Sequence, residues 1–144
     1  MVRKATKDDG RILAKMAVRM WDRHTIEELE MEFTETLNDA KAAFFIKYVD
    51  GLPIGFAQCG LRTDYVEGTE SSPVGYLEGI FVQANYRGNG YAKELLWNCE
   101  NWAKQMGCAE FASDCELDNI GGLKFHIAMG FVEANRIICF KKRI

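Results

Sequence analysis

The clearest pattern along the chain is an apolar run at residues 76–82, which predicts a buried strand. A turn with two glycines follows it, and a helical pattern begins directly after the turn. Gly107 stands where the C-cap of this helix is expected. The helix is indicated by apolar residues that recur on one face, namely Ala92, Leu95, Leu96, Cys99, Trp102, Ala103 and Met106. The centre of the sequence therefore predicts a strand, a glycine-containing loop and a helix in direct succession.

The remaining patterns predict further strands and helices on either side of this unit. Helices are expected after the N-cap residues Thr6, Thr25 and Asp118. The Asp50-Gly51 turn is typical of a hairpin between two antiparallel strands. Strands are expected at residues 2–5, 42–49, 54–61, 109–115, 131–132 and 137–141. The resulting order, β-α-α-β-β-β-α-β-α-β-β, predicts a mixed α/β fold with a central mixed sheet flanked by helices, in one domain over residues 1–144.

Composition and charge argue against several classes of protein. The formal net charge of −3 disfavours nonspecific nucleic-acid binding, because that needs a basic face. No apolar run reaches the roughly 20 residues that span a bilayer, so no membrane partner is expected. The five cysteines lack C-x-x-C spacing and are interpreted as buried thiols in a reducing cytoplasm. His24 and His126 stand outside any cluster of potential ligands, so we expect no metal.

The loop between the central strand and its helix has the chemistry of an anion site. A helix N-terminus presents N–H groups without intrahelical acceptors, together with a partial positive charge. Gly88 and Gly90 lack the Cβ atoms that would keep an anion away from the backbone, and Arg87 adds a full positive charge. The same residues could also form an ordinary surface turn between a strand and a helix. The loop alone leaves both interpretations open.

Two motifs together resemble those of the GNAT superfamily of N-acetyltransferases. The run Arg87-x-x-Gly90-x-Ala92 is similar to the superfamily signature (Q/R)-x-x-G-x-(G/A). The stretch 119–131 matches the motif N-x-x-A-x-x-x-Y-x-x-x-G-F at its asparagine and at its final Gly-Phe. The predicted order of elements is also that of the superfamily. The resemblance covers the whole chain and implies the GNAT fold, with acetyl-CoA as co-substrate and no metal.

The resemblance assigns the donor site to the loop and to the strand before it. The backbone N–H groups of the loop are expected to hold the pyrophosphate of acetyl-CoA. The strand edge at Ile80 and Val82 is expected to pair with the pantetheine arm, and the Val82 N–H to polarise the thioester carbonyl. Asn119 is expected to contact CoA from the last helix. The loop residues implied in binding are Arg87, Gly88, Asn89, Gly90, Tyr91 and Ala92.

Three residues are candidates for acid–base chemistry. Glu78 is an acid within an apolar strand, so it either has a structural salt-bridge partner or faces a polar cleft. Asp114 ends the neighbouring strand and could face the same cleft, where the two carboxylates could hold an ammonium group and accept its proton, or it could cap the following turn. His126 takes the place of the tyrosine that protonates the leaving thiolate in the superfamily. It is expected either to act there as an acid or hydrogen-bond donor, or to pack on the helix.

A closer resemblance concerns the acceptor. Residues 62–68, 71–74 and 77–82 look like the corresponding segments of bacterial aminoglycoside 6′-N-acetyltransferases. This implies an enzyme that transfers acetyl from acetyl-CoA to the 6′-amine of an aminoglycoside antibiotic by direct attack in a ternary complex. The polar loop 62–73 could alternatively be a solvated connection, and nearby aromatic residues could serve packing. The residues expected to bind the cationic acceptor are Trp21, Asp64, Tyr65, Glu67, Glu70, Glu78 and Asp114.

Other functions remain open at this point. The chain could acetylate another amine, such as a polyamine or a peptide N-terminus, or it could be a non-catalytic regulator that binds acyl-CoA. Relatives in the resembled subgroup are commonly homodimers, and the strand-rich C-terminus from Arg136 to Lys142 is a plausible pairing edge.

Overall fold

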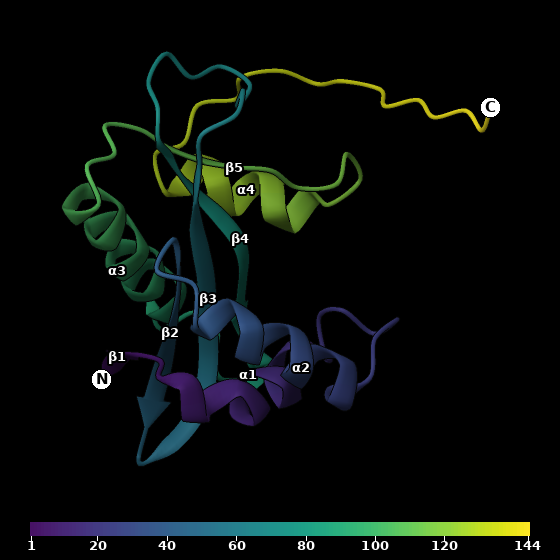
Figure 1. Ribbon diagram of the computed structural model, residues 1–144. Helices are drawn as coiled ribbons and strands as arrows, with labels where there is room; N and C mark the ends of the chain where they lie inside the picture. Colours follow the sequence, from purple (N-terminus) through teal and green to yellow (C-terminus); the bar gives the residue numbers. More distant parts are fainter.

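The computed structural model describes all residues 1–144, and its centre is a five-stranded sheet in the order β1-β2-β3-β4-β5 (Figure 1). β1 to β4 pair antiparallel with their neighbours, whereas β4 and β5 are parallel. The predicted hairpin is confirmed, because Asp50 and Gly51 both have the positive φ that a two-residue hairpin turn requires. The mixed α/β class is confirmed as well. The strands are β1 (Val2–Lys4), β2 (Ala42–Val49), β3 (Leu52–Arg62), β4 (Val74–Val82) and β5 (Phe111–Ser113).

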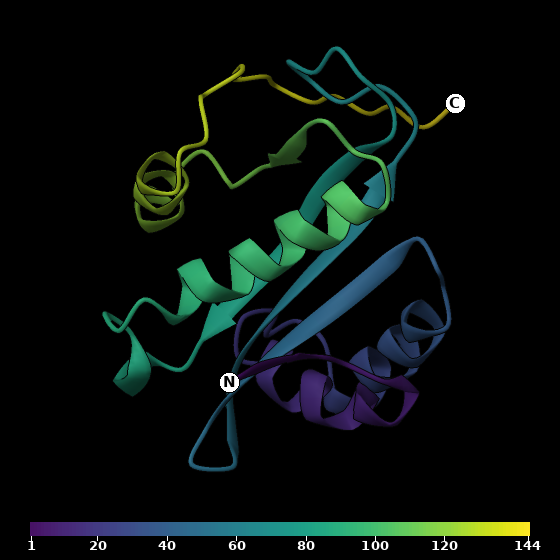
Figure 2. The ribbon, with the colours of Figure 1, turned by 90° about the vertical axis from the view of Figure 1, so that its left-hand side faces the viewer.

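Helices cover both faces of the sheet. One face carries α1 (Gly10–Ala17), which follows a short 3₁₀ turn at Lys7–Asp9, and α2 (Ile26–Leu37). The long helix α3 (Tyr91–Gln105) crosses the opposite face (Figure 2). The last helix, α4 (Ile120–Ala128), lies beside β5 at the edge of the sheet (Figure 1). None of the helices is both long and apolar enough to cross a membrane.

Alternation along β2 and β3 divides the core into two layers. Phe44, Ile46 and Phe56 pack with α1 and α2, while Phe45 and Cys59 pack with α3. Successive side chains of a strand face opposite sides, so a strand with helices on both faces needs apolar residues at nearly every position. This is why the apolar runs in the sequence predict these strands.

One carboxylate fixes the N-terminal strand to the start of α1. Arg3 donates to both oxygens of Asp9 at 2.8 Å, and the Thr6 N–H donates to Asp9 at 2.7 Å. The hydrogen bond from Arg3 lowers the pKa of Asp9 to about 2, although burial acts in the opposite direction. The predicted N-cap at Thr6 belongs to the same arrangement, since its hydroxyl accepts from the Asp8 N–H.

The ends of the other helices follow the predictions with one exception. Thr25 caps α2 as expected, and its hydroxyl accepts from the N–H three residues further on. Gly107 follows the C-cap of α3 with φ of +91°. The cap of α4 is Asn119 and not Asp118, because the Asn119 Oδ1 accepts the Gly122 N–H at 2.9 Å. Asp118 lies one residue too early to reach the same N–H group.

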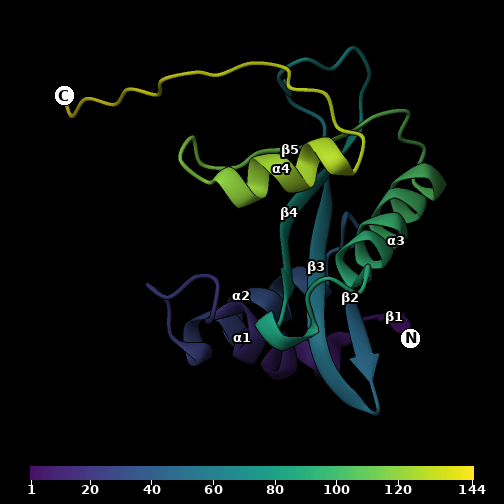
Figure 3. The ribbon, with the colours of Figure 1, turned by 180° about the vertical axis from the view of Figure 1, so that it is seen from behind.

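The prediction of two C-terminal strands is wrong. Residues after α4 have no regular secondary structure, and the end of the chain leads away from the sheet (Figure 3). Ile137, Ile138 and Phe140 are 68%, 80% and 88% exposed. Strand propensity mainly expresses how such side chains fit a half-buried pleated surface, and no strand of this chain lies beside them. The segment therefore has a strand-forming sequence without a strand to pair with.

The expectation that all cysteines are buried is also only partly right. Cys59 and Cys99 are buried between β3 and α3, and Cys108 is half-buried. Cys115 and Cys139 are exposed. Cys115 follows β5, and Cys139 lies in the segment that was predicted to be the last strand.

Replacing Asp9 by Asn should lower the free energy of unfolding at pH 7 by about 2 kcal/mol, in line with the depressed pKa of this carboxyl group. Because the folded-state pKa lies below the unfolded value, this stabilisation is present above about pH 4 and is lost as the pH falls through about 2. Urea unfolding at several pH values measures both effects.

The exposed pair between Arg11 and Glu30 provides the control, with side chains 52% and 36% exposed. Glu30→Gln should cost less than about 1 kcal/mol. An Asp9→Asn variant with wild-type stability and an unchanged acid transition would contradict the role given to Asp9.

Candidate active site

β4 and β5 separate part-way along the sheet, and this divergence defines the candidate site. Only Gly75–Leu77 of β4 pairs with β5, through Phe111–Ser113, although β4 continues to Val82. A β-bulge at Glu78 marks the point of separation, since the register between β3 and β4 shifts there. The second half of β4 therefore pairs with β3 on one side and has a free edge on the other.

The free edge of β4 carries backbone donors. The Gln83 N–H donates to the Ile54 carbonyl of β3 at 2.9 Å. Because N–H groups alternate between the two sides of an antiparallel strand, those of Val82 and Ile80 point away from β3. The Val82 carbonyl lies on the same free edge, where it accepts from Arg87 Nε at 2.9 Å. Ile80 and Val82 thus have the orientation that pairing with an extended ligand requires.

The loop after β4 presents a row of N–H groups without partners. Those of residues 88–93 have no acceptor within the protein, and no side chain caps α3. Asn89 closes the loop by donating to the Tyr86 carbonyl at 2.9 Å. Gly88 and Gly90 have φ of +82° and +79°, which is costly for a residue with a Cβ. The protein itself needs glycine here for conformation and not for space, since an added Cβ would meet no atom within 4 Å.

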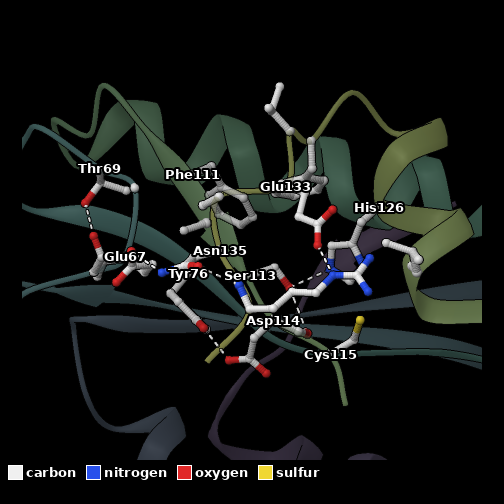
Figure 4. Close-up of a pocket in the computed structure, with 18 of the residues that line it drawn as sticks. Glu67, Thr69, Tyr76, Phe111, Ser113, Asp114, Cys115, His126, Glu133 and Asn135 are labelled. Atoms are coloured by element: carbon white, nitrogen blue, oxygen red, sulfur yellow. Dashed lines mark hydrogen bonds and ion pairs between the residues drawn. The ribbon is translucent and has the colours of Figure 1, made fainter. Parts of the chain in front are cut away.

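A network around Tyr76 joins the two predicted catalytic carboxylates, and Figure 4 shows its part between Tyr76 and Asp114. The Tyr76 hydroxyl donates to Asp114 Oδ2, and burial together with this hydrogen bond raises the pKa of Tyr76. Arg62 lies over the Tyr76 ring, with its Cζ atom 3.4 Å from the ring centroid. The same guanidinium donates to both oxygens of Glu78 at 3.0 Å. Glu78 therefore has a salt-bridge partner, which is one of its two predicted alternatives, and its side chain is half-exposed.

Asp114 borders a cleft of about 760 Å³ between β5, the loop at residues 66–69, α4 and residues 131–139 (Figure 4). The cleft is acidic, and its single basic lining residue is Arg136. Such a wall attracts cations, and dissolved salt screens the attraction. The carboxylates that line the cleft are Glu67, Glu100, Glu110, Asp114, Glu116 and Glu133.

His126 lies in this cleft with both ring nitrogens engaged. Nδ1 is 2.6 Å from the Gly122 carbonyl, and Nε2 is 2.7 Å from Ser113 Oγ. A carbonyl can only accept, so Nδ1 carries the proton in the neutral ring and Nε2 accepts from the Ser113 hydroxyl. The ring also packs edge-on against Phe125 and Phe131. His126 thus holds α4 to β5, and it can deliver a proton only after it has gained a second one.

The predicted acidic loop does not form one cluster. Glu67 lines the cleft, where its carboxylate accepts from the Tyr65 hydroxyl at 2.8 Å and from Asn135 Nδ2 at 3.1 Å. Tyr65 itself is 80% exposed. Asp64 and Glu70 are not among the lining residues.

Two aromatic side chains named among the candidate binding residues have packing partners in this chain. Trp21 packs edge-on against Phe33 and Phe56, and its ring lies 2.9 Å from the position of an added Cβ at Gly79. The Tyr91 ring covers the Lys47 ammonium, with 4.6 Å between the nitrogen and the ring centroid. Trp21 thereby supports β4 next to the bulge, and Tyr91 supports the start of α3.

Sequence reasoning missed Tyr76 and Glu110. Tyr76 pairs with Ala112, so Asp114 is the diagonal neighbour of Tyr76 on the same face of the sheet. The sequence does not reveal this neighbour, because the register of β4 against β5 must be known first. Glu110 accepts the N–H groups of Glu70 and Ser71 at 2.8 Å and so fixes the loop beside the cleft. Hydrogen bonds from the Ser71 hydroxyl and from these N–H groups lower the pKa of Glu110.

In this mixed sheet the fourth and fifth strands diverge, and the uncapped N-terminus of α3 follows the fourth strand. This is the architecture of an acyl-CoA-dependent N-acyltransferase. The profile of the Acetyltransferase (GNAT) family matches residues 7–131, which is most of the chain. The chain belongs to the GNAT acetyltransferase family, and the predicted family resemblance is confirmed.

Individual relatives and solved structures show which members of this family the chain resembles. Over 141 residues the chain is 40% identical to an aminoglycoside N(6′)-acetyltransferase type 1 of Stenotrophomonas maltophilia, covering 97% of this chain and 91% of the relative. A Serratia marcescens protein of the same name is 37% identical over 140 residues, covering 95% of this chain and 96% of the relative.

Two solved structures of the aminoglycoside N-acetyltransferase AAC(6′)-Iy are similar over the full length of this chain. One is a complex with CoA, at a TM-score of 0.96, 37% identity and 95% coverage of that protein. The other is a complex with the bisubstrate analogue CoA-S-monomethyl-acetylneamine, at a TM-score of 0.95, 37% identity and 98% coverage of that protein.

Proposed function

We propose that this chain is a cytoplasmic aminoglycoside 6′-N-acetyltransferase, in which residues 1–144 form one catalytic domain. The observation that carries the proposal is the free edge of β4, which runs from the carboxylates at the bulge to the N–H groups before α3. The names of the relatives and the bisubstrate complex of a similar enzyme support the same acceptor.

The residues present fit the acetyl-CoA donor. The pyrophosphate would be held by the N–H groups of the loop, which have no acceptor in the protein and stand at the positive end of a 15-residue helix. Ile80 and Val82 would pair with the pantetheine arm and offer an N–H to the thioester carbonyl. Asn119 keeps its Nδ2 free while its Oδ1 caps α4, so it can also donate to the donor. The loop residues assigned to this role are Arg87, Gly88, Asn89, Gly90, Tyr91 and Ala92.

The acceptor would be bound and activated by the carboxylates at the bulge and the cleft. Asp114 has one oxygen engaged by Tyr76, and its other oxygen is available to an ammonium group. Glu78 is held in place by Arg62 and could accept the amine proton directly or through water. Loss of that proton leaves a neutral amine, which attacks the thioester carbonyl in a ternary complex. Glu67 would add attraction for a second ammonium group.

The leaving thiolate needs a proton, and the amine that has attacked must lose one to become an amide, so this proton can pass to the thiolate directly or through water. His126 would bear on this step only through Ser113. With Nε2 accepting from the Ser113 hydroxyl, the neutral histidine holds that hydroxyl in a fixed position. We assign to His126 the role of positioning β5 and α4. A proton delivered by His126 itself would require the imidazolium form.

Exchanging Gly90 for Ala should weaken acetyl-CoA binding by about tenfold, because the positive φ becomes strained by about 1–2 kcal/mol and the N–H groups re-orient. Gly107→Ala is the matched control, with φ of +91°, the same open surroundings, and a place at the other end of α3. It should lose similar stability and keep its affinity. Calorimetric titration of both folded variants with acetyl-CoA makes the comparison. Equal affinities of the two variants would contradict the proposal that the loop binds the phosphates.

The function itself is tested by the position of the acetyl group. Incubation with acetyl-CoA and kanamycin should give a product acetylated at the 6′-amine, located by NMR or mass spectrometry, and an analogue with a 6′-hydroxyl should give none. The KM for the antibiotic should rise with salt as the acidic cleft is screened. Acetylation at another amine would refute the regiochemistry, and turnover of polyamines or peptides alone would refute the substrate class.

The carboxylates are tested by Asp114→Asn and Glu78→Gln. Each should lower kcat/KM for the aminoglycoside by about 10²-fold while acetyl-CoA affinity stays near wild type. Glu116→Gln is the control, because Glu116 lines the cleft without a hydrogen bond to the network and should have a small effect. A wild-type kcat/KM in Asp114→Asn would show that this carboxylate takes no part in the reaction.

A further inference from the structure

Asp9 and Lys47 are the only charged residues that are buried in this protein. Asp9 belongs to the N-terminal arrangement described above, whereas Lys47 lies on β2, on the face that packs against α3 through Ala43 and Phe45. A buried ammonium group loses its hydration, and an apolar side chain of similar volume would serve the core at least as well. The reason for a lysine at this position therefore lies in what its ammonium group contacts.

The Lys47 ammonium group joins β2 to the first turn of α3. Its Nζ donates to Glu94 Oε2 at 2.7 Å and lies 4.6 Å from the centroid of the Tyr91 ring. Both partners belong to the first turn of the helix. Burial lowers the pKa of Lys47, but the hydrogen bond to Glu94 and the other contacts raise it overall. Lys47 is therefore charged at neutral pH.

Glu94 places a negative charge directly beside the loop assigned to the donor. Its N–H donates to the Gly90 carbonyl at 3.1 Å, so it stands one helical turn after the N-cap. The N–H groups without partners, those of residues 88–93, come immediately before it. A carboxylate near a helix N-terminus is attracted by the partial positive charge there, and it repels a second anion. Glu94 by itself would thus oppose the binding of a pyrophosphate.

We propose that Lys47 is a positioning residue for the donor site. Its ammonium group holds the Glu94 carboxylate against the sheet and cancels its charge, so that the N–H groups before α3 keep their affinity for the phosphates of acetyl-CoA. Lys47 acts through Glu94 and needs no contact with the donor. This inference rests on the proposed function, in which the loop at residues 87–92 binds the pyrophosphate.

Lys47 is better placed for this role than the neighbouring positive charge. The side chains of Lys47 and Glu94 are 7% and 41% exposed, so water and salt screen the pair less than a pair on the open surface. The N-terminal ammonium group also lies close to Lys47, and this contact lowers its pKa. Because the N-terminal group is exposed, water screens its effect on Glu94.

The test first measures the contribution of the phosphates in the wild-type protein. The full-length chain is titrated with acetyl-CoA and with S-acetylpantetheine, which has the same acetylated arm without the pyrophosphate and nucleotide, and no amine is present. NMR titration gives both dissociation constants. Acetyl-CoA should bind at least about tenfold more tightly. Equal binding of the two donors would overturn the assignment of the loop, and with it this inference, whatever the Lys47 variants do.

Lys47→Met should weaken the binding of acetyl-CoA by about tenfold and leave that of S-acetylpantetheine within about twofold of wild type. The variant should remain folded in urea titrations, because methionine fills the apolar position and Glu94 can be solvated. Lys104→Met is the matched control. It removes the same charge from the exposed side of the last turn of α3 and should bind both donors like the wild type.

Glu94→Gln tests the same claim without a change at the buried position. It should not weaken acetyl-CoA binding, because it removes the charge that opposes the phosphates. The double variant Lys47→Met/Glu94→Gln should return to within about threefold of the wild-type affinity. A second substitution of this kind cannot restore lost packing, so the recovery separates an effect of charge from mere support of the helix.

Three results would overturn the role of Lys47 while the donor loop stands. The first is a Lys47→Met variant that binds acetyl-CoA like the wild type or loses affinity for both donors equally. The second is a double variant that stays as weak as Lys47→Met. The third is a Glu94→Gln variant that weakens acetyl-CoA binding as much as Lys47→Met does.

Discussion

The structure depends on the interruption of strand pairing at Glu78. Backbone N–H and C=O groups in a sheet interior normally have partners, and leaving them without partners is costly when water is excluded. β4 nevertheless pairs with β5 over only three residues and then continues alone on that side. The bulge at Glu78 bends the strand at this point, and helices on both faces hold it in place. A linear ligand with amide groups is the kind of molecule that satisfies such an edge.

The charges at the two ends of this edge differ in sign. Beyond Val82 lie Arg87 and the uncapped N-terminus of α3, which favour an anion. At the other end lie Glu78 and Asp114, and Glu78 is about 13 Å from Val82 at the spacing of an extended strand. One strand thus separates a binding region for phosphates from a binding region for ammonium groups. This arrangement suits the transfer of an acyl group from an anionic donor to a cationic acceptor.

The sequence predicts best what is local. The strand, loop and helix from residue 76 to residue 106 are confirmed because apolar spacing and glycine positions determine them within a few residues. The partner of Glu78 could not be chosen from sequence, since Arg62 reaches it only through the register of β3 against β4. The role of His126 could not be chosen from sequence for a similar reason, because its hydrogen-bond partner Ser113 lies on β5 and not on α4. The two C-terminal strands were predicted from propensity alone, and propensity does not show whether a neighbouring strand is present in the same chain.

Residue-resolved hydrogen exchange along β4 tests the account most directly. The amides of Gly79 and Phe81 should exchange slowly in the free protein because they face β3, whereas those of Ile80 and Val82 should exchange fast. Adding acetyl-CoA should slow the Ile80 and Val82 amides selectively. Protection of these two amides in the free protein, or exchange that acetyl-CoA leaves unchanged, would contradict the free edge as the donor site.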